Sequence, residues 1–313
     1  MNWKQKALIQ KFIAMLPSDL SYATHYMFQR RFGGLRDVDP TQEHLAGAIT
    51  IADYITNHGG SMESKTFLEL GPGRRVNLPI GLWLCGASRI ITVDINPYLK
   101  SEIVFENIVY IQKHEERITA MFGRHALGSS FRERLQQLLH APRNLEDLLR
   151  LMRIEYLAPA DAAHLGLPDK SIDYYISYNV MEFIPPQTLK SILLEGKRIL
   201  RGQGLHIHSV DFADWFAQSD TSISEINFLQ FGEDEWNHYA GNRYTYHNRM
   251  RVDDFVDMFN AAGLKVLSLD SSIDPRALSE LKKGFPLSER FRGKSHETNA
   301  TSDAWIVASH HDT

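Results

Sequence analysis

The sequence predicts an α/β fold in which a doubly wound, mostly parallel sheet of seven strands is covered by helices on both faces. From Lys65 onward, short apolar runs of strand length alternate with stretches whose apolar residues recur at helical spacing. Such alternation is typical of parallel sheets, because parallel neighbours need a long crossover connection. With 313 residues, 43% of them hydrophobic, the chain can bury the core of one large decorated domain.

The expected elements follow one another in a regular order. Strands are expected at residues 66–70, 89–95, 153–161, 171–180, 205–212, 264–270 and 303–311. Helices are expected at residues 76–87, 188–204 and 252–263, the second closed by Gly202 and Gly204 and the third by Gly263. A helical insertion is expected at about 101–152, and an aromatic-rich insertion at about 212–251.

The first 62 residues are expected to form a helical N-terminal cap or lid ahead of the main domain, residues 63–313. Apolar residues recur at helical spacing in 6–16 and 44–55, and the glycine- and proline-containing stretch 28–40 between them predicts a turn or loop. Its basic residues Arg30, Arg31 and Arg36 are candidates for holding an anionic group from a lid, although solvated surface charge is the interpretation we favour.

Composition limits the partners of the protein. The net charge of -4 and the pI of about 6.4 provide no positive field for nucleic acid or an acidic membrane. No stretch approaches the roughly 18 apolar residues of a membrane span. The single cysteine, Cys85, allows no intrachain disulfide and fits a reducing compartment. We therefore expect a cytoplasmic protein with no nucleic-acid or membrane partner, and a homodimer is left open.

The stretch "FLELGPG" places two glycines directly after the first predicted strand. Ligands of open α/β sheets bind at the carboxyl ends of the strands, so this turn is the expected start of a site. Gly71 and Gly73 allow a sharp bend and a close approach of a ligand to the main chain. A lone G-x-G is nevertheless weak evidence.

Two acids make the turn more informative. Asp94 ends the second predicted strand at the spacing where a carboxylate accepts hydrogen bonds from the hydroxyls of a ribose. Glu69 adds negative charge beside the glycines, which would attract an amino group or a sulfonium and repel a pyrophosphate. Val76 also stands where a dinucleotide fingerprint has its third glycine, so NAD is the weaker interpretation.

The sequence resembles the class I S-adenosylmethionine-dependent methyltransferases. "ELGPG" is similar to their first motif, with Arg75 in place of the usual last glycine, and "ADAAHLGLPDKSIDYYISYNVMEFIP" (160–185) is similar to their later motifs, with Phe183 where histidine is common. The resemblance spans about 65–263 and implies a Rossmann-like methyltransferase fold with S-adenosylmethionine as cofactor. Asp161 would accept a hydrogen bond from the adenine amino group. The implied cofactor-binding residues are Glu69, Gly71, Pro72, Gly73, Asp94, Ile95, Asp161, Ala162, Asn179 and Val180.

Methyl transfer from a sulfonium mainly requires alignment of the acceptor and exclusion of water, and a general base helps when the acceptor atom is a hydroxyl oxygen. His208 as base and Asp211 as its orienting partner are the preferred candidates, and His247 is a further catalytic candidate. A hydrogen-bonded core histidine beside a helix-capping Asp211 is the alternative to catalysis. His206, His208 and Asp211 are also metal-ligand types, but without further ligands nearby we expect no metal.

The aromatic-rich insertion supplies the candidates for holding the acceptor. Trp215, Trp236 and Tyr246 are candidates for stacking on a ring or a sugar, and Arg249 and Arg251 for holding an anionic group. The alternative is that these side chains pack an accessory subdomain.

We expect transfer of a methyl group to a small-molecule acceptor, most simply O-methylation of a sugar derivative or natural product. The segment after the fourth strand lacks the Asn-Pro-Pro motif of adenine N6 methylation, and Cys85, in a predicted core helix, is no candidate for the nucleophile of cytosine C5 methylation. The alternatives are a non-catalytic protein that binds S-adenosylmethionine and a nicotinamide-dependent oxidoreductase.

Overall fold

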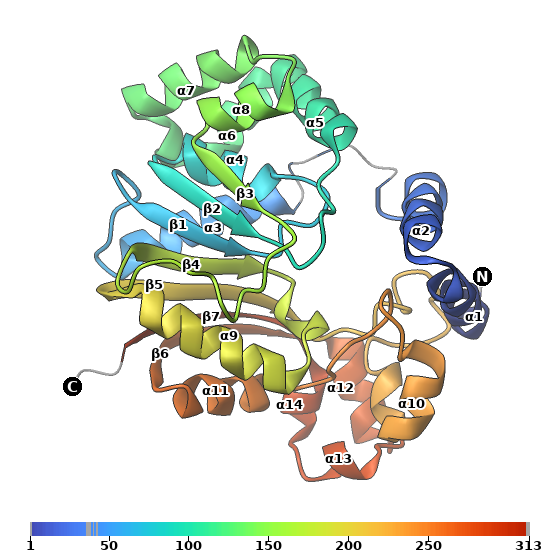
Figure 1. The fold of residues 1–313 in the computed structure, drawn as a ribbon. Coiled ribbons are helices and arrows are strands. Elements are labelled where there is room, and N and C mark those ends of the chain that lie inside the picture. Colours follow the sequence, from blue (N-terminus) through green and yellow to red (C-terminus); the bar gives the residue numbers. More distant parts are fainter. Residues whose placement is uncertain (1, 36–38, 40, 42, 311–313) are drawn as a thin grey trace.

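The computed structural model describes residues 2–35, 39, 41 and 43–310. Seven strands form one sheet in the order β3-β2-β1-β4-β5-β7-β6 (Figure 1). They are β1 (Thr66–Leu70), β2 (Arg89–Val93), β3 (Ile154–Leu157), β4 (Ile172–Tyr178), β5 (Leu200–Asp211), β6 (Leu264–Ile273) and β7 (Thr301–His310). The first five run parallel, and β7 lies antiparallel between β5 and β6. The predicted α/β class and its mostly parallel seven-stranded sheet are confirmed.

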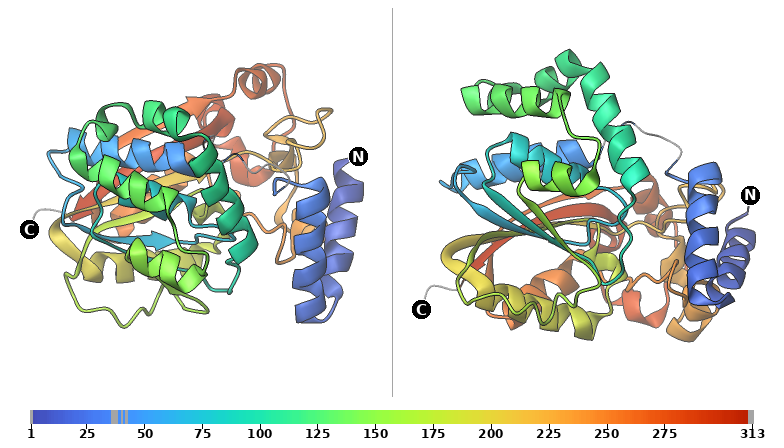
Figure 2. Two further views of the ribbon diagram at one scale, coloured as in Figure 1. Left: turned by 90° about the horizontal axis from the view of Figure 1, so that it is seen from above. Right: turned by 45° about the horizontal axis from the view of Figure 1, so that its top comes forward.

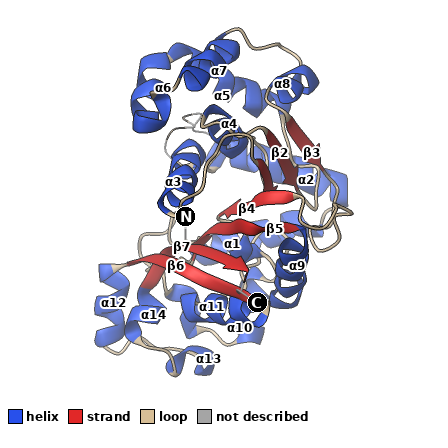
Figure 3. Cartoon of the chain, turned by 90° about the vertical axis from the view of Figure 1, so that its left-hand side faces the viewer, coloured by secondary structure: helices blue, strands red, loops and turns tan. Residues whose placement is uncertain are grey.

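Helices cover both faces of the sheet (Figures 1 and 3). One face carries α3 (His44–Asn57), α4 (Asn77–Leu84), α5 (Ser101–Lys113), α6 (Glu115–Phe122), α7 (Ser129–Leu139) and α8 (Leu145–Leu151). The other face carries α9 (Pro186–Ile199) and α11 (Val252–Ala261). Every residue of α4 is buried, because α3 and α7 cover the side that faces away from the sheet. In contrast, α9 buries Leu189, Ile192, Leu193 and Ile199, the stripe expected of a helix packed on one side only.

A smaller cluster lies beside the sheet and contains α10 (Glu233–Ala240), α12 (Pro275–Lys282), α13 (Glu289–Arg292) and α14 (His296–Ala300). Short 3-10 turns η1 (Gly123–Ala126), η2 (Met181–Phe183) and η3 (Asn227–Gln230) complete the elements. The core of the cluster is aromatic, and Trp3 packs its ring against Phe216, Phe231, Trp236 and Tyr239. The N-terminus is thereby fixed to the region that follows β5.

Helices α1 (Trp3–Met15) and α2 (Ser18–Phe32) lie side by side beyond one end of the sheet (Figure 2). Of the helices in residues 1–62, α3 instead belongs to the main core, where Leu45, Ile51 and Ile55 are fully buried. In the described part of the chain, no helix combines the length and the apolar character that crossing a membrane requires.

Several predicted boundaries were wrong; the strand expected at 153–161, for example, ends at Leu157. The helix expected at 188–204 ends at Ile199, and Gly202 and Gly204 lie in β5, which begins early because Leu200 already pairs with Ile172 of β4. The loop expected at 28–40 begins only after Phe32, because α2 continues to that residue before Gly33 caps it through a bond to the Gln29 carbonyl.

Candidate active site

The bend after β1 depends on two glycines. Gly71 has a φ of 71° and Gly73 a φ of 65°, the left-handed region that favours glycine. A Cβ on Gly71 would lie 2.6 Å from Cγ1 of Val180, so the segment after β4 packs directly on the bend. A Cβ on Gly73 would meet nothing within 4 Å, which leaves open space above the second glycine.

The carboxylate of Asp94 closes the bend from the next strand. Its Oδ2 accepts the backbone N–H of Gly73 at 3.2 Å, and its Oδ1 accepts the N–H of Asn96 at 2.9 Å. Burial raises the pKa of Asp94 to about 6, against the opposing effects of these N–H groups and of Arg74. The tips of β1 and β2 therefore meet, and an acceptor of hydrogen bonds lies at their junction.

Glu69 does not carry the charge expected of it. The side chain is 2% exposed, and the Thr92 hydroxyl donates to its Oε2 at 2.5 Å. Burial, with a further contribution from Asp94, raises the pKa of Glu69 to about 8. The protonated acid is thus favoured at neutral pH, because the desolvated carboxylate is costly.

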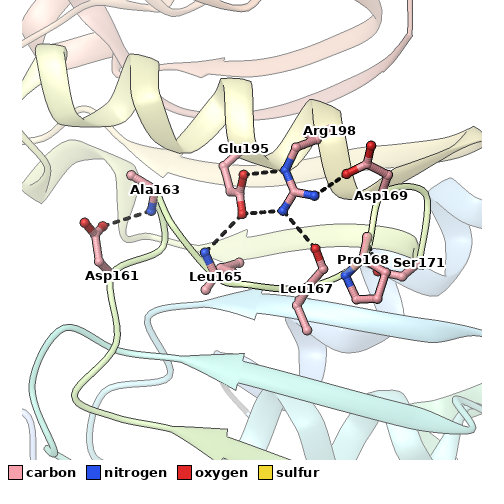
Figure 4. A network of polar contacts seen from close by, with 9 residues as sticks. All are labelled: Asp161, Ala163, Leu165, Leu167, Pro168, Asp169, Ser171, Glu195 and Arg198. Carbon is pink, nitrogen blue, oxygen red and sulfur yellow. Dashed lines mark hydrogen bonds and ion pairs between the residues drawn. The ribbon is translucent and has the colours of Figure 1, made fainter.

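The loop after β3 is fastened to α9 by an ion-pair network (Figure 4). Arg198 pairs with Glu195 at 2.8 Å and with Asp169, and donates to the Leu167 carbonyl at 2.9 Å. Glu195 also accepts the Leu165 N–H at 3.0 Å. The network therefore holds both ends of the loop that follows Asp161.

Asp161 lies at the start of this loop with half of its side chain exposed. It accepts the N–H of Ala163 at 2.9 Å, and this bond, with His164, lowers the pKa of its carboxyl group. The carboxylate is therefore ionised and still accessible, as an acceptor for an adenine amino group must be.

The segment after β4 is held in an unusual conformation. Asn179 has a φ of 53°, which is uncommon for a residue other than glycine. Its Oδ1 accepts the Ser209 hydroxyl at 2.7 Å, and its backbone N–H donates to the Ser209 carbonyl at 3.0 Å. These bonds to β5 stabilise the turn that places Val180 on Gly71.

Comparison with known proteins identifies the domain. Residues 130–208 match the family model described as a methyltransferase domain, which covers β3, β4, the loop between them and β5 up to His208. The glycine bend lies outside this match. No curated protein sequence matches the chain. The chain therefore contains a methyltransferase domain.

Solved methyltransferases are similar in fold at low identity. The 1,6-didemethyltoxoflavin-N1-methyltransferase of Burkholderia thailandensis is 13% identical, with a TM-score of 0.46 over 95% of this chain and 91% of the other. An S-adenosylmethionine-dependent methyltransferase of Clostridium acetobutylicum is 11% identical, with a TM-score of 0.46 over 93% and 98% of the two chains. The magnesium protoporphyrin IX methyltransferase of Synechocystis is 12% identical, with a TM-score of 0.44 over 86% and 83%. With TM-scores below 0.5, these likenesses add no argument of their own.

The strand tips of this methyltransferase fit S-adenosylmethionine chemically. Asp94 offers a carboxylate at the glycine bend, where a ribose needs a hydrogen-bond acceptor. Ile95 beside it is 64% exposed, an apolar surface suited to the face of an adenine. The pKa of Glu69 and the pKa of Asp94 are both raised, so a cationic ligand would relieve the unfavourable burial of two carboxyl groups. The predicted cofactor-binding residues Pro72 and Ala162 are neighbours in the chain of Gly71 and Asp161, respectively.

Helix α2 covers these tips through residues that the sequence did not indicate. The Tyr22 hydroxyl donates to Oδ1 of Asn96 at 3.1 Å. The guanidinium of Arg74 lies over the rings of Tyr26 and Tyr98, 5.1 and 5.2 Å from their centroids. The spacing of Tyr22, His25 and Tyr26 on one helix face was the available signal.

Two of the basic residues considered for the lid lie at the surface, the interpretation that we favoured. Arg30 forms a partly exposed ion pair with Glu106 of α5 at 2.6 Å, and Arg31 is exposed. Arg36 lies outside the described residues.

The expected pair of His208 and Asp211 is not formed. His208 is fully buried, with Nδ1 bonded to the Ser177 hydroxyl at 2.8 Å and Nε2 3.2 Å from Nδ1 of His206. Burial lowers the pKa of His208 well below its ordinary value. Asp211 instead accepts the Trp215 indole N–H at 3.0 Å. Residues three apart in a strand point to opposite faces, so the alternation of β5 already argued against the pair.

Arg249 and Arg251, predicted to hold an anionic group, are bound to the protein itself. Arg249 is 1% exposed and donates to the Phe228 and Phe231 carbonyls and to Glu233. Arg251 is fully buried and donates to the carbonyls of Phe212, Asn299 and Thr301. The guanidinium of Arg249 joins two parts of the insertion, and that of Arg251 holds the insertion against α14 and β7, so the structure does not place either group for ligand binding.

Two cavities open at the carboxyl ends of β4 and β5. The larger measures about 540 Å³, and its wall includes Asn179, Ser209, Asp211 and Asp214. The smaller measures about 50 Å³ and is lined by Asp214, Trp215, Trp236 and His247 among others. Tyr246 is half-buried and lies in neither wall. Within the described residues, no group of three or more His, Cys, Asp or Glu side chains is arranged to hold a metal ion.

Replacing Glu69 tests whether burial raises the pKa of its carboxyl group. Because the pKa of Glu69 rises from 4.5 to about 8 on folding, the native state binds this proton more tightly than the unfolded chain. The free energy of unfolding should therefore fall as pH rises through this interval, and Glu69→Gln should make that fall shallower. Urea denaturation at several pH values measures the slope. The exposed Glu63→Gln is the control and should keep the wild-type slope; an equal slope in Glu69→Gln would contradict the assignment.

Replacing Arg251 separates a structural role from ligand binding. Arg251→Met leaves three buried carbonyls without their donor, so the free energy of unfolding should fall by about 3 kcal/mol or more. Arg150→Met removes only exposed ion pairs on α8 and should cost less than about 1 kcal/mol. Urea denaturation of both variants measures these free energies of unfolding. An Arg251→Met protein as stable as the wild type would contradict the structural role and favour the ligand-binding interpretation.

Proposed function

We propose that this methyltransferase methylates a hydroxyl oxygen of a small-molecule acceptor bound in the larger cavity. The observation that supports this is the position of Asn179 in the cavity wall, one residue before the Val180 that packs on the glycine bend. The acceptor would therefore lie beside the cofactor cradle. A volume of about 540 Å³ falls in the range of small-molecule sites.

The wall of this cavity favours acceptors without phosphate groups. Five acids contribute to it, against one basic residue among those that line it, Arg276. The acids are Asp211, Asp214, Glu225, Asp274 and Asp303. Burial, and then Asp274, Asp211 and Asp303, raise the pKa of Glu225. This concentration of acids would repel a nucleic acid or a nucleotide sugar, which supports a sugar derivative or natural product without phosphate. A homodimer and a cytoplasmic location stay predictions.

The chemistry divides between the cofactor and the chain. Bound at the strand tips, S-adenosylmethionine would supply a methyl group on a positively charged sulfur. The chain must hold the acceptor oxygen in line, exclude water and take up the proton that the hydroxyl loses as its new C–O bond forms. Asp211, in the cavity wall, is our proposed acceptor of that proton, and burial raises the pKa of its carboxyl group toward that of a useful base.

His247 is better suited to position an oxygen than to take its proton. The N–H of Arg249 donates to Nδ1 of His247 at 2.9 Å, so the neutral ring carries its hydrogen on Nε2. Burial, together with Arg251 and Arg249, lowers the pKa of His247 to about 3, which keeps the ring neutral. In this tautomer the Nε2–H group can donate a hydrogen bond to an oxygen atom of the acceptor.

Replacing Asp94 tests the cofactor site. Asp94→Asn removes the charge that would accept the ribose hydroxyls, so the affinity for S-adenosylhomocysteine should fall by about tenfold or more. Titration calorimetry with S-adenosylhomocysteine measures this directly. Asp53→Asn on α3, which removes a carboxylate paired with Arg124 and His125, should retain wild-type affinity. Unchanged binding by Asp94→Asn would exclude the proposed cradle.

Replacing Asp211 tests the proton acceptor. Labelled S-adenosylmethionine incubated with small-molecule extracts identifies an acceptor and provides the assay. Turnover should rise as pH increases through the raised pKa of Asp211, because only the carboxylate can accept a proton. Asp211→Asn should lower kcat by roughly 10² to 10⁴ and flatten the pH profile while leaving the affinity for S-adenosylhomocysteine unchanged. A variant with the wild-type profile would remove Asp211 from the reaction.

A further inference from the structure

The smaller cavity lies where the N-terminal helix meets the region after β5. Lys6 and Gln10 of α1 form one side, and Asp214 lies in its wall as well as in the wall of the larger cavity. Phe183, at the end of η2, also lines it. Because η2 directly follows Val180, one short segment contacts both the glycine bend and this cavity. The smaller cavity is thus placed as a subsite of the acceptor site.

The lining of this cavity is mainly aromatic. Its rings belong to Phe183, Trp215, Phe216, Phe228, Trp236 and Tyr244. Such walls favour the faces and edges of another ring, and they strip water from any hydroxyl that enters without a partner. A sugar, which carries hydroxyls all around its ring, would leave many of them unbonded here. An aromatic ring with oxygen on one edge would not.

Two buried donors in the wall have no hydrogen-bond partner in the part of the chain that the structure describes. Trp236 is 3% exposed, and its Nε1 has no hydrogen-bond partner among the described residues. His247 is 7% exposed, and its Nε2 is likewise without a partner. The Asp211 backbone lies near the His247 ring, but it makes no hydrogen bond of normal geometry to Nε2. Buried N–H groups in native proteins are almost always bonded, so both groups indicate an absent acceptor atom.

The charges in the wall oppose one another. Lys6 lies near Asp214, and its Nζ donates to the Ser219 hydroxyl at 2.8 Å. Asp214 accepts the Asn227 side-chain N–H at 2.8 Å and the Phe216 N–H at 2.9 Å. A cage for an ammonium ion would need an unopposed acid, and a site for an anion would need an unopposed base. The balance favours an uncharged ligand.

The volume of the smaller cavity limits how much of a ligand it can hold. A cavity of about 50 Å³ holds roughly four water molecules at about 10–15 Å³ each. It therefore admits the edge of a ring with its substituents, while the rest of the molecule extends toward the larger cavity.

We propose that this cavity binds the oxygen-bearing edge of an uncharged aromatic acceptor, with the N–H groups of Trp236 and His247 donating to its oxygen atoms. This inference rests on the proposed function and narrows the acceptor from small molecules in general to phenols and related aromatic rings.

NMR spectroscopy of the tryptophan indole N–H groups tests the proposal. The protein is labelled with ¹⁵N in its five tryptophans and saturated with S-adenosylhomocysteine. Trp236→Phe identifies the Trp236 signal. Resorcinol should move this signal downfield, as a new hydrogen bond to Nε1–H requires, and should bind at least tenfold more tightly than cyclohexane-1,3-diol. Phenyltrimethylammonium, which carries a ring and a charge, should bind more weakly than resorcinol.

Paired variants separate the missing donor from lost packing. Trp236→Phe should weaken resorcinol binding by about five- to thirtyfold, while Trp3→Phe, in the same aromatic cluster but outside the cavity wall, should leave it unchanged. If Trp236→Phe does not fold, the Trp236 indole signal of the wild-type protein is assigned from spectra that link it to the backbone. The shift of this signal on addition of resorcinol then tests the proposal. A Trp236 signal that resorcinol does not move, or equal binding of the diol, overturns the proposal. Failure of S-adenosylhomocysteine to bind would instead overturn the proposed function.

Discussion

The junction of three strand tips is the constraint on which the rest of the structure depends. The Gly71 N–H donates to the Val93 carbonyl at 2.8 Å, and Asp94 accepts from Gly73. Val180 closes the third side, against the face of Gly71 where a Cβ would stand. Because the order of the sheet reverses between β1 and β4, the connections that follow these two strands lead to opposite faces of the sheet, and a crevice is expected between them. This junction places Asp94 and Val180, whereas the Arg198 network on α9 holds the loop that follows Asp161.

Helix α2 connects the junction to the acceptor region. Tyr22 contacts Asn96 beside Asp94, and its ring packs edge-on against Tyr244, 6.1 Å between centroids. The His25 ring stacks on Tyr244 at 3.9 Å. Tyr244 also lines the smaller cavity. Through α2, the two proposed binding regions therefore share packed side chains.

The sheet and its tips could be predicted because they depend on local patterns. Apolar runs give strands, glycines give the bend, and parallel pairing then brings Asp94 to Gly73 without further information. The buried arginines could not be predicted, since nothing in the residues around Arg249 and Arg251 reveals that distant carbonyls surround them. The pairing of His208 with Asp211 is excluded by strand alternation, because residues three apart in β5 point to opposite faces of the sheet.

The segment after β4 carries a further buried acid. Glu182 is fully buried, and no hydrogen bond of normal geometry reaches either of its carboxyl oxygens among the described residues. Burial raises its pKa well above the ordinary value, because the desolvated carboxylate is costly. Folding therefore disfavours the ionised form of Glu182, as it does the ionised form of Glu69.

Buried acids near the site make stability depend on what the site holds. The pKa values of Glu69 and Asp94 are raised by burial, and each carboxyl group would gain from a positive charge brought into the crevice. A ligand with a sulfonium and an ammonium group supplies that charge, so its binding would favour ionised carboxylates and release protons at neutral pH. By mass action such a ligand also stabilises the native state that binds it. The same two carboxyl groups that cost stability in the free protein thus provide the electrostatic preference for a cationic cofactor over a pyrophosphate.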